Sequence, residues 1–493
     1  MSDEAVERLI LMPRRALRAR ASRLSSRAAR VLEKLDDWTG LHDTLATARG
    51  VRCRVLDSIR GDGAKLIEVA RADVPAMRAA LPELDLVPLV YYMPALAPRP
   101  TAVGPPSNAV VAAAAAAIRL TILDSATNRP VSGATVAAFT DFSALAGRNG
   151  VSDEDGVVQL EFDAAFVAIE RLYVYPPVAG YWGHFRRDLT LADGLQIALQ
   201  PIDLRWTDSL RHFYKAGGAT VGEGVTVGLI DGGVGPHPDL DCEGDADNGS
   251  GHGTHVAGII AARGTPPAGV RGLAPGVKLR SYRVFGTPLG LAANFSIAKA
   301  IDTAVLEDKC DLINLSFILE DAANDSAVRS ALEDARAAGA LPIAATGNKF
   351  RQPVGFPASD PMCIAVSALG RKGTFPAESL ETSDVVAPFG LDQNDFIAAF
   401  SNIGLEVDLT APGSGIISTV PGGYGVMSGT SMACPAVTGI AARLLARDQK
   451  LLTMTRGPSR SAKIAQLVLG AAASLGFSVD LQGAGLLQEQ GEV

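Results

Sequence analysis

The stretch Val225-Thr-Val-Gly-Leu-Ile-Asp-Gly-Gly-Val234 decides the fold class. Its first six residues form a short apolar run that ends at Asp231-Gly-Gly, which is typical of a strand buried on both faces of a parallel sheet. Helical stretches such as 325–338 separate it from similar runs at 279–284, 312–315, 341–345 and 363–367. This alternation predicts an α/β domain with a doubly wound parallel sheet, whose strands end where active-site groups collect.

Four polar residues lie at the ends of such strands or at the starts of helices. Asp231 follows the strand at 225–230, and Asn348 ends Ala344-Ala-Thr-Gly-Asn348 after another strand. His252 lies in Gly251-His-Gly-Thr-His-Val-Ala-Gly258, and Ser431 lies in Ser428-Gly-Thr-Ser-Met-Ala-Cys-Pro435 before the apolar helix at 436–445. A helix N-terminus favours developing negative charge. Taken singly, each residue has an ordinary explanation, such as a turn for Asp231 or a helix cap for Ser431.

Taken together, the residues supply a hydroxyl, a base, a carboxylate and an oxyanion donor, the four groups that a serine peptidase needs. Gly228-Leu-Ile-Asp-Gly-Gly-Val234, Gly251-His-Gly-Thr-His-Val-Ala-Gly258 and Gly429-Thr-Ser-Met-Ala-Cys-Pro435 resemble the three signature blocks of the subtilase family, in the same chain order. The resemblance covers residues 204–488. It implies that Ser431 is the nucleophile, that His252 carries its proton and that Asp231 orients His252. It also implies that the Ser431 N–H and Asn348 bind the oxyanion.

Residues Ser316, Phe317 and Ile318 resemble the substrate-binding strand of the family, with one departure. Ile318 stands where relatives carry glycine, so we expect a narrower cleft between the S1 and S4 subsites. Residues 371–395 resemble an insertion near the cleft rim, which would serve as a lid or an exosite. Cys434, one turn after Ser431, is expected to pack rather than react.

No metal ion or cofactor is predicted. His252 and His255 have metal-ligand spacing, but no third ligand accompanies them. A calcium site is conceivable in the acidic loop that holds Asp241, Glu243, Asp245 and Asp247, although a solvated loop is the favoured interpretation. Residues 263–270 lack the asparagine that relatives use in their strong calcium loop.

Upstream of the α/β domain (202–493) the pattern predicts four segments. Residues 1–45 are expected to hold a basic amphipathic helix at 13–35, which either packs on the protein or docks on a membrane surface or partner. Residues 46–96 follow a β-β-α-β pattern, with strands at 51–59, 64–69 and 85–92 and a helix at 74–81 capped by Asp73. This small α+β domain resembles the inhibitory propeptide of subtilases.

A Pro-rich linker (97–116) leads to a small β-sandwich (117–201), with turns expected at Asn149-Gly150 and Asp155-Gly156. The sandwich resembles the modules attached to carboxypeptidases.

Bulk properties narrow the function further. The formal net charge of −8 argues against non-specific nucleic-acid binding. Five scattered cysteines without C-x-x-C spacing argue against a disulfide framework or a zinc site. Neither a signal peptide nor an apolar run of transmembrane length is recognisable, which favours a cytoplasmic protein, although many proteases of this type are exported.

The sequence thus predicts a serine endopeptidase that is kept latent by its N-terminal region and acts on protein or peptide substrates. Two alternatives stay open: a subtilase-type peptide ligase or macrocyclase, and a non-catalytic binding protein on the same scaffold. The sandwich and the basic N-terminal helix are the candidate surfaces for partners.

Overall fold

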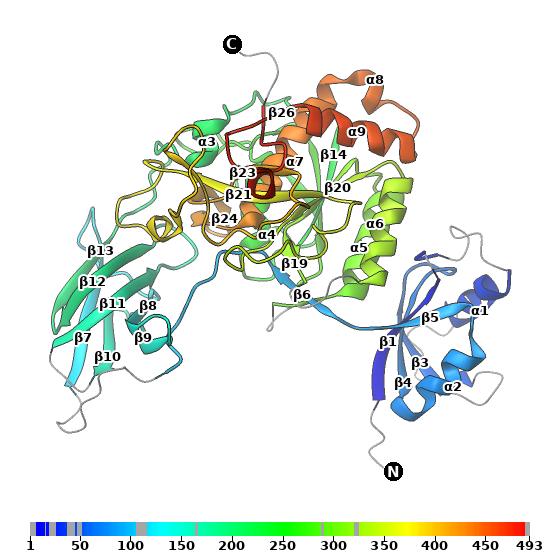
Figure 1. The fold of residues 1–493 in the computed structure, drawn as a ribbon, viewed down its shortest axis with the longest axis horizontal. Coiled ribbons are helices and arrows are strands. Elements are labelled where there is room, and N and C mark those ends of the chain that lie inside the picture. Colours follow the sequence, from blue (N-terminus) through cyan, green and yellow to red (C-terminus); the bar gives the residue numbers. More distant parts are fainter. Residues whose placement is uncertain are drawn as a thin grey trace.

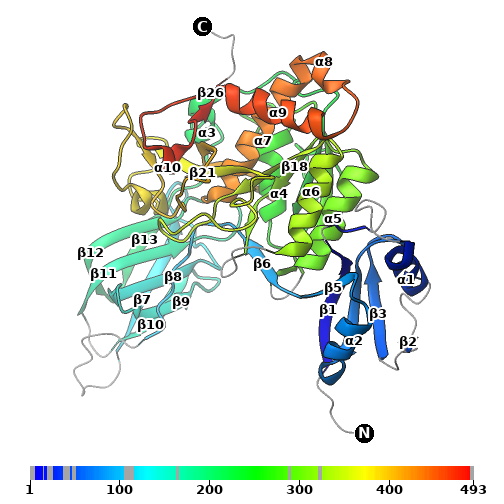
Figure 2. The same ribbon diagram turned by 45° about the vertical axis from the view of Figure 1, so that its right-hand side comes forward.

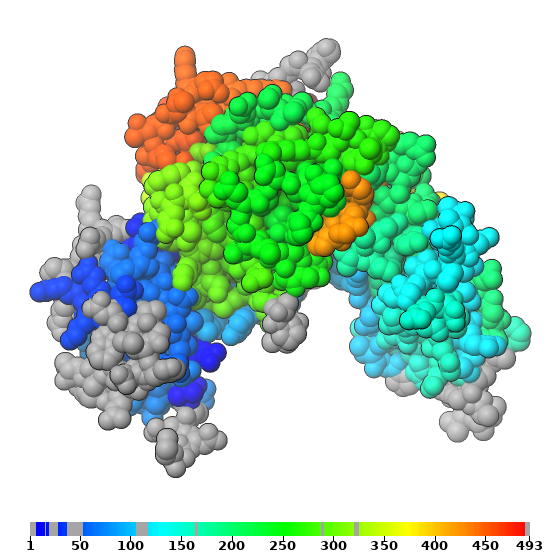
Figure 3. Space-filling view, turned by 180° about the vertical axis from the view of Figure 1, so that it is seen from behind, coloured from blue at the N-terminus to red at the C-terminus, as the bar shows by residue number. Residues whose placement is uncertain are grey.

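The computed structural model describes residues 6–14, 16–18, 26–36, 45–46, 52–104, 116–162, 166–286, 290–319 and 325–488. The α/β domain lies between two smaller bodies, an N-terminal domain and a β-sandwich, which form separate lobes on opposite sides (Figures 1 and 3). In the described part of the chain no helix has the length and apolar character needed to cross a membrane.

The N-terminal domain is built on one antiparallel sheet with the strand order β2-β3-β4-β1-β5. Its first strand, β1 (Val6–Pro13), pairs with both β4 and β5 and buries the run from Leu9 to Met12. The remaining elements are α1 (Ser26–Asp36), β2 (Leu45–Ala46), β3 (Arg52–Ser58), β4 (Lys65–Ala70), α2 (Val74–Ala80) and β5 (Leu84–Pro88).

Three predictions for this region were wrong. The helix expected at 13–35 begins only at Ser26, because Pro13 ends β1 and Arg14 lies in a turn. Residues 1–45 are therefore no separate helical segment, since β1 lies inside the sheet formed by residues 52–88. Asp73 has helical backbone angles and makes no capping hydrogen bond to α2. Residues 19–25 of the expected helix lie outside the described residues.

The sandwich packs a three-stranded sheet (β10-β7-β13) on a four-stranded sheet (β12-β11-β8-β9). Alternating inward side chains such as Ile118, Leu120 and Ile122 form its core, as strands with one solvated face require. Asn149-Gly150, expected as a turn, lies inside β9, where both residues pair with β8. The strands are β7 (Ala116–Asp124), β8 (Thr135–Asp141), β9 (Ala146–Val151), β10 (Val157–Phe162), β11 (Phe166–Tyr175), β12 (His184–Ala192) and β13 (Leu195–Leu199).

The α/β domain has a mainly parallel central sheet in the order β15-β16-β14-β18-β20-β21-β23-β27-β26, with β22 paired to β21. Its inner strands β14, β18, β20, β21 and β23 are apolar and buried, and helices cover both faces of the sheet (Figure 1). The strands are β14 (Thr226–Asp231), β15 (Cys242–Gly244), β16 (Lys278–Arg283), β18 (Leu312–Leu315), β20 (Leu341–Ala345), β21 (Ile364–Arg371), β22 (Asp395–Ile397), β23 (Leu409–Pro412), β26 (Ala472–Ala473) and β27 (Leu486–Leu487). The main helices are α4 (His252–Ala261), α5 (Asn294–Leu306), α6 (Ser326–Ala337), α7 (Thr430–Arg447) and α9 (Pro458–Gly470).

Both flanking bodies are attached by specific contacts. The N-terminal sheet packs apolar residues against α5 and α6 (Figure 2), and the buried Asp302 of α5 pairs with Arg18 and Arg60. On the other side, the fully buried Trp182 of the sandwich packs against Trp206, and the insertion at 371–395 contacts the sandwich through Glu378. The insertion therefore lies against the sandwich instead of standing free at the rim.

Candidate active site

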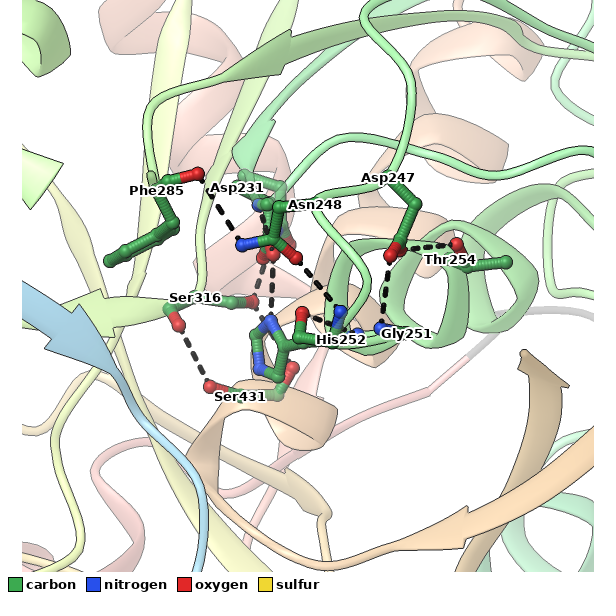
Figure 4. A network of polar contacts seen from close by, with 12 residues as sticks. Asp231, Asp247, Asn248, Gly251, His252, Thr254, Phe285, Ser316 and Ser431 are labelled. Carbon is green, nitrogen blue, oxygen red and sulfur yellow. Dashed lines mark hydrogen bonds and ion pairs between the residues drawn. The ribbon is translucent and has the colours of Figure 1, made fainter. Parts of the chain in front are cut away.

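Three polar side chains are brought together by the ends of three elements. Asp231 is the last residue of β14, His252 is the first residue of α4, and Ser431 is the second residue of α7. Figure 4 shows the imidazole of His252 between Asp231 and Ser431. The strand end and helix starts predicted from the sequence therefore meet at one edge of the sheet.

Asp231 and His252 form a buried pair. The His252 Nδ1 lies 2.7 Å from Asp231 Oδ1, and the two residues are 2% and 0% exposed, respectively. The backbone N–H of Gly232 donates to the same carboxylate oxygen at 2.6 Å. Because a carboxylate accepts from Nδ1–H, this contact holds the tautomer in which Nε2 is free to take a proton.

The hydroxyl of Ser431 does not bond to that free nitrogen. It donates to the carbonyl oxygen of Ser316 at 2.8 Å, whereas His252 Nε2 has no hydrogen-bond partner among the described residues. A rotation about χ1 of Ser431 is therefore needed before proton transfer, which fits the loose catalytic geometry of resting enzymes.

The two donors that the resemblance assigned to the oxyanion have different surroundings. The backbone N–H of Ser431 donates to the carbonyl oxygen of Ala95 at 3.0 Å. Asn348 accepts from the Thr430 N–H through Oδ1 at 2.9 Å, and its buried Nδ2 makes no hydrogen bond within the described part of the chain. The bond to Oδ1 thus fixes the orientation of the Asn348 amide, and the N–H groups of Nδ2 are left without an acceptor among the described residues.

The last residues of the segment 46–96, which the sequence assigned to the propeptide-like domain, cross this site in an extended conformation, and the strand expected at 85–92 is divided between β5 and β6. β6 (Tyr91–Pro94) pairs with β19 (Phe317–Ile318), so that Met93 lies opposite Ile318. The N–H of Ala95 donates to Ser316 O at 3.0 Å, and the N–H of Ala97 donates to Ser428 O at 2.8 Å. The carbonyl of Ala95 therefore lies against Ser431, and hydrogen bonds before and after this carbonyl hold the segment in place.

The sequence did not single out Ala95, because alanine has no reactive side chain. The one available signal was its position at the end of the segment 46–96, which resembles a propeptide. Ser316, Phe317 and Ile318, which the resemblance assigned to substrate binding, lie along this segment of the same chain.

The acidic loop before α4 is tied to protein groups. Asp247 accepts from the N–H groups of Gly249 and Gly251 and from the hydroxyl of Thr254, which fixes the turn that leads into His252 (Figure 4). Asp241 pairs with Arg263, Glu243 pairs with Arg280, and Asp245 accepts from the Arg283 N–H. Across the described residues, no three His, Cys, Asp or Glu side chains are grouped to hold a metal ion.

Two further residues that drew attention in the sequence are buried inside the domain. The imidazole of His255 bonds to Ile416 O at 3.0 Å, and burial lowers its pKa to about 3. Cys434 lies against Asn314 Oδ1 and Ile343 O, and burial raises the pKa of its thiol to about 12. A neutral imidazole and a protonated thiol are suited to packing.

Comparisons with known proteins agree with this architecture. A family model described as "Subtilase family" matches residues 222–492, which is more than half of the chain. Alkaline elastase YaB from Bacillus sp. (strain YaB) is 37% identical over 231 residues, which are 45% of this chain and 54% of the relative. The match thus spans about half the length of that protein. Subtilisin BL from Lederbergia lenta is 34% identical over 280 residues, which are 55% of this chain and 90% of the relative.

Solved structures give similar matches. Sphericase covers 57% of this chain and 97% of its own, with 27% identity and a TM-score of 0.47. The prenylagaramide maturation protease PagA covers 58% and 96%, with 26% identity and a TM-score of 0.44. The sequence blocks around Asp231, His252 and Ser431, the parallel sheet that brings them together and the family match lead to one conclusion: this chain belongs to the subtilase family.

Proposed function

We propose that the protein is a serine endopeptidase that is held latent by its own N-terminal region. The observation that carries the proposal is the hydrogen bond from the Ser431 N–H to the carbonyl oxygen of Ala95. This bond polarises one particular peptide bond, Ala95–Leu96, beside a hydroxyl and a buried Asp–His pair.

The contacts suggest how each group acts. Once Ser431 Oγ turns from Ser316 O to His252 Nε2, it attacks the Ala95 carbonyl carbon while His252 takes its proton. The Ser431 N–H and Asn348 Nδ2 stabilise the negative charge that forms on the carbonyl oxygen. His252 then gives its proton to the leaving amine of Leu96, and water releases the acyl group by the same steps in reverse.

Latency follows from occupation of the cleft. The segment that contains Ala95 is held by backbone hydrogen bonds on both sides of the bond, and it is continuous with a domain docked on α5 and α6. A protein substrate must displace it. Cleavage of Ala95–Leu96, followed by departure of residues 1–95, would open the site.

The experiment measures the intact mass of purified wild type and of Ser431→Ala, before and after a fluorophosphonate probe. We expect the wild type to separate into residues 1–95 and 96–493 and to gain one adduct on the larger fragment. Ser431→Ala should stay intact and unlabelled, whereas Ser143→Ala, an exposed change in the sandwich, should behave as wild type. Processing or labelling that persists in Ser431→Ala would refute the proposal.

A peptide ligase is the second candidate, because the leaving amine is tethered. Pro100 O accepts from the Tyr175 hydroxyl at 2.9 Å, which anchors the chain to the sandwich shortly after Leu96. The released amine therefore stays near the acyl-enzyme. Adding the amide of Leu-Ala-Pro-Arg distinguishes the reactions, since a ligase joins it to residue 95 and a hydrolase leaves a free carboxylate there.

A further inference from the structure

The segment bound in the cleft defines which residues face which subsites. Ala95 donates to Ser316 O and offers its carbonyl to the Ser431 N–H, so it precedes the reactive bond and occupies the P1 position. Counting back from Ala95, Met93 takes the P3 position and Tyr92 the P4 position. Met93 lies opposite Ile318 in an antiparallel pair, and successive side chains of β6 point to opposite faces.

The side chain of Tyr92 fills a closed pocket. Its exposed fraction is 0%, and its ring packs edge-to-face on Phe317 with 5.6 Å between centroids and lies 6.4 Å from Phe356. At the end of the pocket the phenol hydroxyl donates to Asp325 Oδ2 at 2.9 Å. The aromatic walls alone would accept the side chain of Tyr or Phe. The Asp325 carboxylate distinguishes the two, because only Tyr has a hydroxyl that can donate to it.

Asp325 has a second role that keeps it in place. It precedes α6, and its Oδ1 accepts from the Ala327 N–H at 2.9 Å as a helix cap. Its exposed fraction is 5%, and burial raises its pKa. A phenylalanine in the pocket would withdraw the phenol donor from this buried carboxylate, which keeps the Ala327 N–H and the Asn294 side chain as donors. The loss is that of one hydrogen bond to a charged group.

Ile318 limits the space that is available to the P1 side chain. An added Cβ on Gly347, next to Asn348, or on Gly355 would come within 2.2 Å of Ile318 Cδ1. The isoleucine side chain therefore occupies the space beside these two glycines, and it belongs to the same buried cluster as Ala95. Ala95 is 1% exposed in this confined position, and Ile318 itself is 4% exposed.

We propose that the enzyme selects peptides with tyrosine at P4 and a small residue at P1, through Asp325 and Ile318, respectively. This inference rests on the proposed peptidase activity and names its substrate class. Both determinants lie outside the catalytic groups, so each should change selectivity without removing the reaction.

The test compares kcat/KM for three fluorogenic peptides in the self-processed full-chain enzyme: Tyr-Met-Pro-Ala-Leu-Ala, its P4 Phe analogue and its P1 Leu analogue. We expect wild type to favour Tyr over Phe by about tenfold or more, as a hydrogen bond to a charged group allows. Asp325→Ser keeps a good helix cap and withdraws the carboxylate, so its ratio should fall to about twofold. Ile318→Gly should accept P1 Leu about tenfold better than wild type while keeping the Tyr preference. Ratios within one preparation do not depend on how much N-terminal fragment stays bound.

Equal use of Tyr and Phe by wild type, or an unchanged ratio in Asp325→Ser, would overturn the P4 assignment. An unchanged P1 preference in Ile318→Gly would overturn the P1 assignment. Absence of all cleavage and of probe labelling would instead refute the peptidase activity.

A measurement that needs no catalysis tests the two subsite assignments separately from the proposed peptidase activity. In the Ser431→Ala chain, Tyr92→Phe should raise the rate at which an added protease cuts the segment around Ala95 by about tenfold, since the segment loses its buried hydrogen bond. Tyr91→Phe is the matched control, because Tyr91 is 53% exposed. Ala95→Leu should have the same effect as Tyr92→Phe, and Ile318→Gly should reverse it. Equal rates for all these chains would contradict both pockets.

Discussion

Asn348 shows how one side chain can serve two purposes in the candidate active site. Its Oδ1 accepts the Thr430 N–H, which orients the amide, and its Nδ2 is left without a partner among the described residues. A buried donor without an acceptor is costly unless charge arrives there during the reaction. The arrangement therefore fits a donor that is used in the transition state.

We predict that Asn348→Ala lowers kcat by about 10²- to 10³-fold, the size found for an oxyanion-hole donor in subtilisin itself. KM should change little, because the donor acts mainly on the developing charge. Steady-state kinetics on the Tyr-Met-Pro-Ala-Leu-Ala peptide measures both constants. Asn348→Asp, which keeps the acceptor for Thr430 and loses the donors, should be at least as slow. A loss below threefold in both variants would exclude the role.

At the scale of elements, the loop before α4 determines where His252 lies. α4 begins after Gly251, which has a φ of 74° and offers no side-chain cap. Asp247 supplies the missing acceptor by bonding to Gly249 N, Gly251 N and Thr254 Oγ1. The carboxylate thus acts as a cap placed five residues before the histidine.

Replacing Asp247 with alanine should lower the free energy of unfolding by about 1–3 kcal/mol, because three donors lose a charged acceptor. It should also reduce kcat, since the imidazole loses its fixed approach. Urea unfolding and peptide kinetics test the two effects. Asp241→Ala is the matched control, because its pair with Arg263 is exposed and should contribute below about 1 kcal/mol. Equal effects from both changes would contradict the capping role.

Helices and strands were predicted correctly where neighbouring residues determine them. The prediction failed for strands that form only by pairing with residues far along the chain. The strands before Asp231 and Asn348 and the helices after His252 and Ser431 have unambiguous apolar runs beside glycine. The run from Leu9 to Met12 looked unremarkable because only its pairing with β4 and β5, far along the chain, makes it a strand. Asn149-Gly150 failed for the same reason, since pairing with β8 overrides its turn preference.

The same limit applied to the site. Asp231, His252, Asn348 and Ser431 carry chemistry at the ends of regular elements, so their grouping follows from the parallel sheet. Tyr92 and Asp325 meet only because the N-terminal domain docks on α5 and α6 and lays β6 along β19. No local pattern in either segment reports that docking.

At the scale of the whole molecule, the two flanking bodies hold opposite ends of the cleft segment. The N-terminal domain holds it before Tyr92, and the sandwich anchors Pro100 through Tyr175. Opening the site therefore requires release of the N-terminal domain, whose interface contains the buried Asp302 between Arg18 and Arg60. Asp334 of α6 lies in the same interface, near Arg18 and Asp302, and one of its carboxylate oxygens has no partner in the described chain.

This interface should respond to pH through Asp334. Burial raises its pKa to about 6, with Asp302 adding to the rise and Arg18 opposing it, whereas the released domain would leave its pKa near the ordinary 3.8. The docked state therefore binds the proton more tightly. Docking is strongest below about pH 4, weakens as the pH rises from about 4 to 6, and is constant above that.

In the Ser431→Ala chain, hydrogen exchange at the Ala95 and Ala97 amides, which are bonded only in the docked state, reports this equilibrium. After correction for intrinsic exchange, we expect opening to increase by about thirtyfold between pH 4 and pH 6. Asp334→Asn cannot ionise and should remove most of that increase while the chain stays docked. An equally steep increase in Asp334→Asn would refute the role of Asp334.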